Sequence, residues 1–405
     1  MATLSEKILG ANATEYVDRE VDRAYVHDGT GLQTKIVWDK ISNGQSIKAP
    51  YKTYAIFDHN TPANSSEVAT LQREFREFCK AQQVHFSDVG GGICHQYMAE
   101  GRVAPGEIIV GADSHSCTLG AFGAFATGVG ATDMAGIWGL GETWFRVPES
   151  IGIRLDGKLS QATEAKDIAL WYVSKLGMDG ATYQAIEFIG EGCAALNMSE
   201  RMTLTNMAVE AGAKTGLFYA DEVTEAYLAQ YGTHCQQQEK ENCQYTCELH
   251  VDLNEMVPLL AVPHRVDTVV PVHKYADTKL DQVFIGTCTN GRLEDLERAA
   301  KIMKGKKVSV RTIIAPASQR IYQQALKSGI IETLIAAGCT LIPPGCGPCL
   351  GNHQGVLGEG EIGLSTANRN FKNRMGIGAS YFLSSATTAA LSAVLGVIAD
   401  PMEAL

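Results

Sequence analysis

Long apolar stretches are missing from this chain. No uninterrupted apolar run approaches the roughly 18 residues that a membrane-spanning helix needs, so we expect neither a transmembrane helix nor a membrane partner. The first residues, Met-Ala-Thr-Leu-Ser-Glu-Lys, lack the apolar core of a secretory signal and the arginine-rich pattern of a transit peptide. We therefore expect a cytoplasmic protein.

A long basic run is missing as well. The formal net charge is −11 and is spread along the chain, so nucleic acid is not an expected partner. The cysteines number 11, an odd total at irregular spacing in a chain of 405 residues. This pattern differs from the disulfide framework of a small secreted domain and fits the reducing cytoplasm.

Several catalytic motifs are also lacking. The glycine-rich stretch 120–130 matches neither Gly-x-Gly-x-x-Gly nor a P-loop, so no nucleotide site is expected. Ser114 lies in Asp-Ser-His without the Gly-x-Ser-x-Gly turn that exposes a nucleophilic serine. Nucleophilic hydrolysis is therefore not the expected chemistry.

What the chain does contain is a repeated alternation of short apolar strands and helices. Its length suits two or three domains, and an apolar content of 45% is ordinary for a globular protein. Segment 15–26 looks like one strand, while 67–83, the small-residue stretch 120–141 and 201–213 look helical. The alternation predicts an α/β fold with mainly parallel sheets.

Polar clusters follow directly after the apolar strands. Ligands of open parallel sheets bind beyond the carboxyl ends of the strands, so side chains from several strand ends are expected to share one cleft. The clusters occupy residues 58–59, 95–96, 113–115, 288–292 and 346–349.

Two of these clusters carry thiols. Cys346 and Cys349 lie in the proline- and glycine-rich stretch 339–352, which is expected to be a stiff loop rather than a helix, and Cys288 lies in a polar loop upstream. Three soft thiolates suit an iron–sulfur cluster in which one iron keeps an open position. Their spacing alone also allows half a zinc site or a redox dithiol.

A second group of cysteines lies in the polar, glutamine-rich stretch 229–250, which is expected to be an irregular surface excursion. Cys235, Cys243 and Cys247 have two histidines nearby and could form a separate zinc site. Their spacing fits no standard zinc finger, so plain thiols are the preferred interpretation.

Acid–histidine pairs and arginines supply the remaining candidate chemistry. Asp58-His59 and Asp113-Ser-His115 place a carboxylate beside an imidazole, which supports proton transfer but also occurs in ordinary turns. Arg369 and the nearby Arg374 carry forked cations that suit carboxylates, although a solvated basic loop is the plainer alternative. With an open iron, these groups point to a small polycarboxylic acid as substrate.

Taken in order, the motifs resemble the aconitase superfamily, in particular its isopropylmalate dehydratase large-subunit branch. The similarity runs over nearly the whole chain, from His27-Asp-Gly-Thr to Ser365-Thr-Ala-Asn-Arg-Asn-Phe. Between them lie Gly-Ala-Asp-Ser-His, Gly-Ala-Phe-Ala-Thr-Gly-Val-Gly, Asp-Gly-Ala-Thr-Tyr, Cys-Thr-Asn-Gly-Arg and Gly-Cys-Gly-Pro-Cys.

The resemblance implies three α/β domains around a central 4Fe-4S cluster, in which one iron lacks a protein ligand. The implied cluster ligands are Cys288, Cys346 and Cys349. Regions 1–115 and about 265–405 are expected to carry the acid–base and cluster loops, and about 116–264 to form a middle α/β region.

The same resemblance implies roles for individual residues. His59, oriented by Asp58, matches the acid that protonates a departing hydroxyl group. Catalytic roles are implied for Asp58, His59, His95, Asp113, His115 and Glu210. Contacts to substrate or cluster are implied for His27, Ser114, Asn206, Asn368, Arg369 and Arg374.

The implied reaction is the reversible dehydration and rehydration of a malate-type hydroxy diacid, with the conversion of 2-isopropylmalate to 3-isopropylmalate as the leading case. In this family a serine on a mobile swivel domain, together with an arginine, acts as the base. That domain is not found in the sequence. We therefore expect a separate small subunit to supply it, and the large chain to be inactive alone.

Departures from the isopropylmalate pattern concern the substrate. Asp-His-Asn-Thr-Pro replaces Asp-His-Val-Ala-Pro, Ser-His-Ser replaces Ser-His-Thr, and the text after Arg374 differs. Homoaconitase, 2-methylmalate and 2,3-dimethylmalate dehydratases and isomerases of specialised metabolism therefore stay open. A further class is an RNA-binding regulator, which the intact thiols and the acidic charge disfavour. A zinc- or thiol-stabilised binding protein without catalysis is a third class that stays open.

Overall fold

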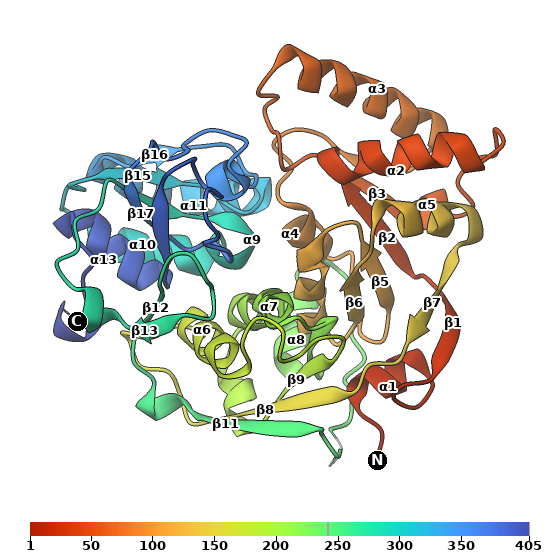
Figure 1. Cartoon of the computed structure of the whole chain (residues 1–405), viewed down its shortest axis with the longest axis horizontal. Coiled ribbons are helices and arrows are strands. Elements are labelled where there is room, and N and C mark those ends of the chain that lie inside the picture. Colours follow the sequence, from red (N-terminus) through yellow and green to blue (C-terminus); the bar gives the residue numbers. More distant parts are fainter. Residues whose placement is uncertain (241–242, 405) are drawn as a thin grey trace.

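The computed structural model describes residues 1–240 and 243–404, and in this part of the chain four β-sheets organise the fold (Figure 1). The five-stranded sheet is entirely parallel. Its strands, in spatial order, are β4 (His85–Ser87), β3 (Thr53–Ile56), β2 (Arg23–His27), β5 (Ile108–Gly111) and β6 (Phe125–Gly128). All residues of β3 and β5 are buried, as expected for strands covered on both faces.

Two different helix layers cover this sheet. On one face, Trp38, Phe75 and Trp138 pack in a single apolar cluster with Val26 and Val110 of the sheet. They come from α2 (Asp28–Ile41), α3 (Ser66–Gln82) and α5 (Ala131–Leu140). The other face packs against α4 (Cys94–Ala99) and the 3₁₀ helix η2 (Ser114–Phe122).

The four-stranded sheet is also parallel. Its strands are β10 (Thr215–Phe218), β9 (Ala185–Ile189), β8 (Ser150–Asp156) and β11 (Cys247–Asp252). The helices α6 (Ala165–Leu176) and α7 (Met198–Met207) pack on it, with Ile168 and Leu204 in the same apolar cluster as Phe188. The helix α1 (Leu4–Leu9) contributes Leu4 to a smaller cluster with Ala185 and Leu217. Two short helices, η4 (Ala208–Ala211) and α8 (Glu222–Ala229), follow α7.

The seven-stranded sheet is mixed, because β12 pairs antiparallel with both of its neighbours while the other pairs are parallel. Its strands are β13 (Val269–Pro271), β12 (Leu259–Ala261), β18 (Ser380–Leu383), β17 (Ile362–Ser365), β14 (Gln282–Ile285), β15 (Arg311–Ile314) and β16 (Thr340–Leu341). Its helices are α9 (Thr287–Asn290), α10 (Leu293–Met303), α11 (Gln319–Lys327), α12 (Ile330–Ala337), α13 (Ala386–Leu395) and α14 (Pro401–Ala404).

In Figure 1 the five-stranded sheet lies at the upper right, the seven-stranded sheet at the upper left and the four-stranded sheet below. The expected α/β fold with mainly parallel sheets is confirmed. The boundary expected at residue 115 falls inside the first sheet, between β5 and β6. None of the helices in the described part of the chain combines the length and the apolar character that crossing a membrane requires.

Two local predictions are wrong. Segment 15–26 is not one strand but two, because β1 (Tyr16–Glu20) pairs with β7 (Glu142–Arg146) in an antiparallel ribbon while β2 enters the five-stranded sheet. The change from alternating exposure in β1 to burial in β2 marks the break. The stretch 120–141 is not one helix either, since Gly123 adopts φ 74° and ends η2 before β6 and α5 follow.

Two other loops are more regular than expected. One turn of 3₁₀ helix, η7 (Gly347–Leu350), forms within the thiol loop, because proline is tolerated in a first helical turn. The end of the stretch 229–250 forms the edge strand β11, which pairs with β8. Residues 241 and 242 of that stretch lie outside the described part of the chain.

Candidate active site

Three sets of hydrogen bonds hold the acid–histidine pair Asp58-His59 at the end of β3. His59 Nδ1 donates to Asp58 Oδ1 over 2.7 Å, and the other Asp58 oxygen accepts from the backbone N–H of Cys94 over 2.7 Å. Asp28 accepts the backbone N–H groups of Asp58, His59 and Asn60 at 3.2, 2.9 and 2.8 Å. Because Asp58 fixes Nδ1 as a donor, His59 presents Nε2 as the nitrogen free for proton transfer.

Asp113, which follows β5, lies next to four histidines. It accepts from His95 Nε2 at 3.0 Å and from the backbone N–H of His115 at 2.8 Å. His59 Nε2 and His27 Nε2 lie 3.6 and 3.7 Å from Asp113 Oδ2, and these two rings stack with centroids 3.7 Å apart. Burial opposes ionisation of Asp113, but the surrounding histidines outweigh it and hold its pKa well below the usual range.

Tyr25 is a residue of the candidate site that the sequence patterns missed. Its hydroxyl group lies 2.9 Å from His95 Nδ1, and the side chain is fully buried. Because His95 Nε2 donates to Asp113, Nδ1 must accept from Tyr25 in the neutral imidazole. A tyrosine inside an apolar strand carries no local signal of this role.

His115 belongs to a second series of charged hydrogen bonds. Its Nε2 donates to Glu210 over 2.8 Å, and Glu210 in turn pairs with Arg369 Nε at 2.8 Å. Burial favours the neutral Glu210 carboxyl group, but His115 and Arg369 outweigh burial and lower its pKa. Glu210 therefore stays a carboxylate and holds Arg369 at the site.

The three predicted thiols are buried, at 7 to 9% exposure. Cys288 lies on α9, where its sulfur accepts from Asn206 Nδ2 at 3.3 Å and from Asn368 Nδ2 at 3.4 Å. Burial raises the pKa of the Cys288 thiol to about 12. A thiolate therefore forms here only with a positive charge beside it, which a bound metal centre supplies.

The loop of Cys346 and Cys349 touches the acid–histidine pair directly. The backbone N–H of Cys346 donates to the carbonyl oxygen of Asp58 over 2.8 Å. Burial opposes protonation of His59, but the Cys346 sulfur and the Asp58 carboxylate outweigh it and raise the pKa of His59 well above its usual range. The protonation of His59 therefore depends on the charge of the thiol loop.

The donor set fits a cluster better than a single zinc ion. Zinc–sulfur bonds of about 2.3 Å would hold any two ligand sulfurs within about 4.6 Å of each other. Among the described residues, the sulfurs of Cys288, Cys346 and Cys349 do not form a group in which every pair lies within 4.8 Å. Ligands on different irons of a cluster are spaced more widely, so this spacing is compatible with the expected 4Fe-4S centre.

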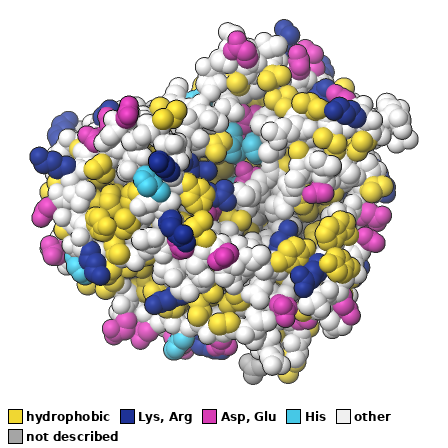
Figure 2. All heavy atoms as spheres, in the orientation of Figure 1, with side chains coloured by type: hydrophobic (Ala, Val, Ile, Leu, Met, Phe, Trp, Pro, Cys, Tyr) yellow, Lys and Arg dark blue, Asp and Glu magenta, His cyan; other side chains and the backbone are white. Residues whose placement is uncertain are grey.

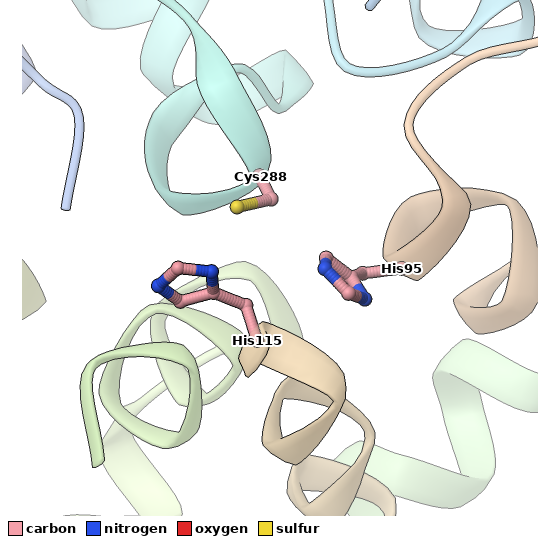
Figure 3. A group of neighbouring side chains, drawn as sticks. All are labelled: His95, His115 and Cys288. Atoms are coloured by element: carbon pink, nitrogen blue, oxygen red, sulfur yellow. The ribbon is translucent and has the colours of Figure 1, made fainter. Parts of the chain in front are cut away.

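Other ligand groups are less suited to a metal ion. The side chains of His95, His115 and Cys288 face a common space, with ligand atoms within 4.8 Å of one another (Figure 3). Both histidines, however, already bond carboxylates through Nε2. As far as the structure describes them, Cys235, Cys243 and Cys247 belong to no such group, which leaves the separate zinc site without support.

A cavity of about 550 Å³ opens onto these residues. Figure 2 shows histidine and basic side chains gathered in a hollow of this face. The predicted site residues that line it are His27, His59, Asp113, Ser114, His115, Arg369 and Arg374. Arg374 also interacts with Cys349, which connects the cavity wall to the thiol loop. Of the remaining predicted residues, Asp58 bonds to His59 and His95 to Asp113, while Glu210 bonds to His115.

Comparison with known proteins gives the family. Residues 4–279 and 273–396 match the model of the aconitase family (aconitate hydratase). The chain belongs to the aconitase family. A probable methanogen homoaconitase large subunit of Methanosarcina mazei is 50% identical over 388 residues, which are 95% of this chain and 99% of that protein. The 3-isopropylmalate dehydratase large subunit 2 of Archaeoglobus fulgidus is 46% identical over 415 residues, which are 100% and 99% of the two chains.

The fold is shared more widely. Aconitase X of Thermococcus kodakaraensis, in its holo-form, superposes with a TM-score of 0.55 at 14% identity, covering 97% of this chain and 89% of that chain. Members of the aconitase family use a 4Fe-4S cluster. The predicted family, its isopropylmalate dehydratase branch and the alternative homoaconitase branch are thus confirmed as likenesses, whereas the roles of individual site residues stay predictions.

Proposed function

We propose that this chain is the cluster-bearing large subunit of a hydro-lyase that reversibly dehydrates a malate-type hydroxy diacid. The observation that carries the proposal is the junction of three buried thiols with an acid–histidine network and two arginines at one cavity. Cys288, Cys346 and Cys349 would hold the 4Fe-4S cluster. When bound, the cluster supplies an iron that lacks a protein ligand and polarises the departing hydroxyl group as a Lewis acid.

His59 is the proposed acid. Asp58 holds its Nδ1, so Nε2 faces Asp113 and the cavity. The hydrogen bond to the Asp58 carboxylate favours a protonated His59, and transfer of that proton lets the hydroxyl group leave as water. His95 and Asp113 would keep this proton in place, and the stacked His27 ring would limit rotation of His59.

The arginines are the proposed carboxylate binders. Glu210 holds Arg369 by one nitrogen, which leaves the rest of the guanidinium for substrate. Arg374 lines the same cavity and is the second proposed carboxylate binder. Ser114, Asn206 and Asn368 would complete the contacts to substrate and cluster.

A second subunit is part of the proposal. The relatives of Methanosarcina mazei and Archaeoglobus fulgidus are named large subunits, which supports a small-subunit partner for this chain. The partner would bring a swivel domain with the serine base and its arginine, which removes the proton alpha to a carboxylate. We propose a cytoplasmic complex of the two.

The leading substrate is 3-isopropylmalate, and a homoaconitase activity is the second candidate. The first rests on several dehydratase relatives at 44 to 46% identity, the second on homoaconitase relatives at 44 to 50%. The cavity wall contains both apolar Val129 and Val209 and the cation Lys214, so it has groups for either an alkyl branch or a further carboxylate.

The experiment is anaerobic co-expression with a candidate small subunit from the same genome, followed by assays on 2- and 3-isopropylmalate, homocitrate, 2-methylmalate and 2,3-dimethylmalate. We expect hydration or dehydration of at least one diacid by the complex and none by the large chain alone. Activity of the isolated chain would refute the two-subunit proposal. Absence of activity on every diacid by an iron-loaded complex would refute the proposed reaction.

A further inference from the structure

Lys166, on α6, is a charged side chain with no exposed surface. Its ammonium donates to the backbone carbonyl oxygens of Thr366 and Ala367 at 2.8 and 2.7 Å. In the ranges that the structure describes, it forms no ion pair with a carboxylate. A buried cation without an anion is costly, so this position needs an explanation.

The acidic side chains nearest to Lys166 are already engaged elsewhere. Asp167 accepts from the backbone N–H groups of Leu259 and Glu164, and burial raises its pKa to about 8. Asp295 accepts from Asn290, and burial raises its pKa to about 7. Among the described residues, neither carboxyl group accepts a hydrogen bond from the Lys166 ammonium, although Asp295 contributes most to keeping it charged.

Two of the predicted cluster ligands, Cys288 and Cys349, are near enough to Lys166 that thiolates at these positions would favour its protonated form. Burial lowers the pKa of Lys166 to about 8, so the ammonium keeps its charge at neutral pH. The anionic partner that the cation lacks among carboxylates is thus available at the thiol centre.

The backbone that Lys166 holds leads straight into the site. Thr366 and Ala367 follow β17 and precede two predicted site residues. The first, Asn368, donates to the Cys288 sulfur at 3.4 Å, and the second, Arg369, pairs with Glu210. A hydrogen bond to these carbonyl groups therefore sets the direction in which both side chains point.

We infer that Lys166 is a positioning residue with two tasks: it clamps the end of β17 so that Asn368 and Arg369 face the site, and it is the buried countercharge of the cluster. The inference rests on the proposed function, since it assumes a bound cluster. It adds a cation that no strand-end motif contains. Lys166 touches neither substrate nor the predicted ligands.

The test uses the cluster-loaded protein and two substitutions. Lys166→Gln removes the charge and keeps a hydrogen-bond donor, whereas Lys166→Met removes both. Lys175→Gln, at an exposed position of the same helix, is the matched control for loss of one positive charge. Iron and sulfide per chain are measured first, and the reduction potential of the cluster is then measured by redox titration followed by EPR.

Removing a buried positive charge disfavours the addition of an electron. We expect both Lys166 variants to have a lower cluster potential than the wild type, or to lose the cluster while the apoprotein still melts cooperatively. Lys175→Gln should match the wild type. A folded Lys166→Gln protein with normal iron content and an unchanged reduction potential would overturn the proposal that Lys166 is a countercharge. If the Gln variant does not fold, the same measurements are made on the Met variant. A wild-type protein without iron would instead refute the proposed function.

Discussion

The backbone N–H of Cys346 donates to the carbonyl oxygen of Asp58 over 2.8 Å. This bond joins the thiol loop after β16 to the acid–histidine loop after β3, although they belong to two different sheets. A movement of either loop therefore changes both the proposed acid and the proposed cluster ligands. Metal binding and proton transfer are expected to respond together to changes at this junction.

Serine in place of any predicted ligand should abolish cluster binding. A hydroxyl group is a poor substitute for a soft thiolate on iron, so Cys288→Ser, Cys346→Ser and Cys349→Ser should each lower the iron content to a small fraction of the wild-type value. Cys247→Ser, at an exposed thiol, should leave it unchanged. Iron and sulfide analysis after anaerobic purification makes the comparison, and a wild-type iron content in the Cys288 variant would remove that residue from the ligand set.

Replacing His59 should affect the reaction more than the cluster. A positioned acid contributes roughly 10²- to 10⁴-fold to a rate, so His59→Asn in the two-subunit complex should lose activity by about that factor with its iron content retained. The control is His250→Asn, because His250 forms a similar pair with Asp156 on the exposed face. The rate of the control should equal that of the wild type. Full activity of the His59 variant would show that another residue is the acid.

Tyr25→Phe should lower the free energy of unfolding, because it removes the hydrogen-bond partner of His95. The change leaves Nδ1 of a buried imidazole without its donor, which costs about 1–3 kcal/mol of stability. Urea unfolding of the apoprotein measures this loss. Activity should fall as well, because His95 no longer has a single favoured orientation toward Asp113. Tyr51→Phe, at an exposed tyrosine, is the matched control for loss of a hydroxyl group.

A pH-dependent stability is expected from Asp221, which is not one of the predicted site residues. Burial favours its neutral form, but the fully buried Arg201, at 2.7 Å, outweighs burial and lowers its pKa. A depressed folded-state pKa stabilises the protein above the unfolded value of about 3.9, and this stabilisation is lost as the pH falls through the folded value. Asp221→Asn should thus cost about 3 kcal/mol near pH 7 and less in acid. Urea unfolding at both pH values measures the difference, and an equal cost at both would contradict the ion-pair explanation.

The strand ends were predictable from sequence because the two signals there are local. Apolar residues of β3, β5 and β14 stop abruptly, and Asp58, Asp113 and Cys288 follow within a few positions. The prediction of one helix over 120–141 was wrong, because small residues are common both in buried strands and in tightly packed helices.

Other parts of the site had no local signal at all. Tyr25 and Lys166 read as ordinary members of a strand and a helix, and their partners are 70 and about 200 positions away in the chain. Asp28 likewise acts by accepting backbone N–H groups of a loop that follows another strand. Such contacts depend on tertiary packing, so only the fold reveals them.

The central claim is that three thiols of this chain hold a 4Fe-4S cluster, and anaerobic metal analysis with titration of free thiols tests it most directly. The proposal predicts about four iron and four sulfide atoms per chain. Finding zinc in place of iron, or no metal with all 11 cysteines free, would contradict it.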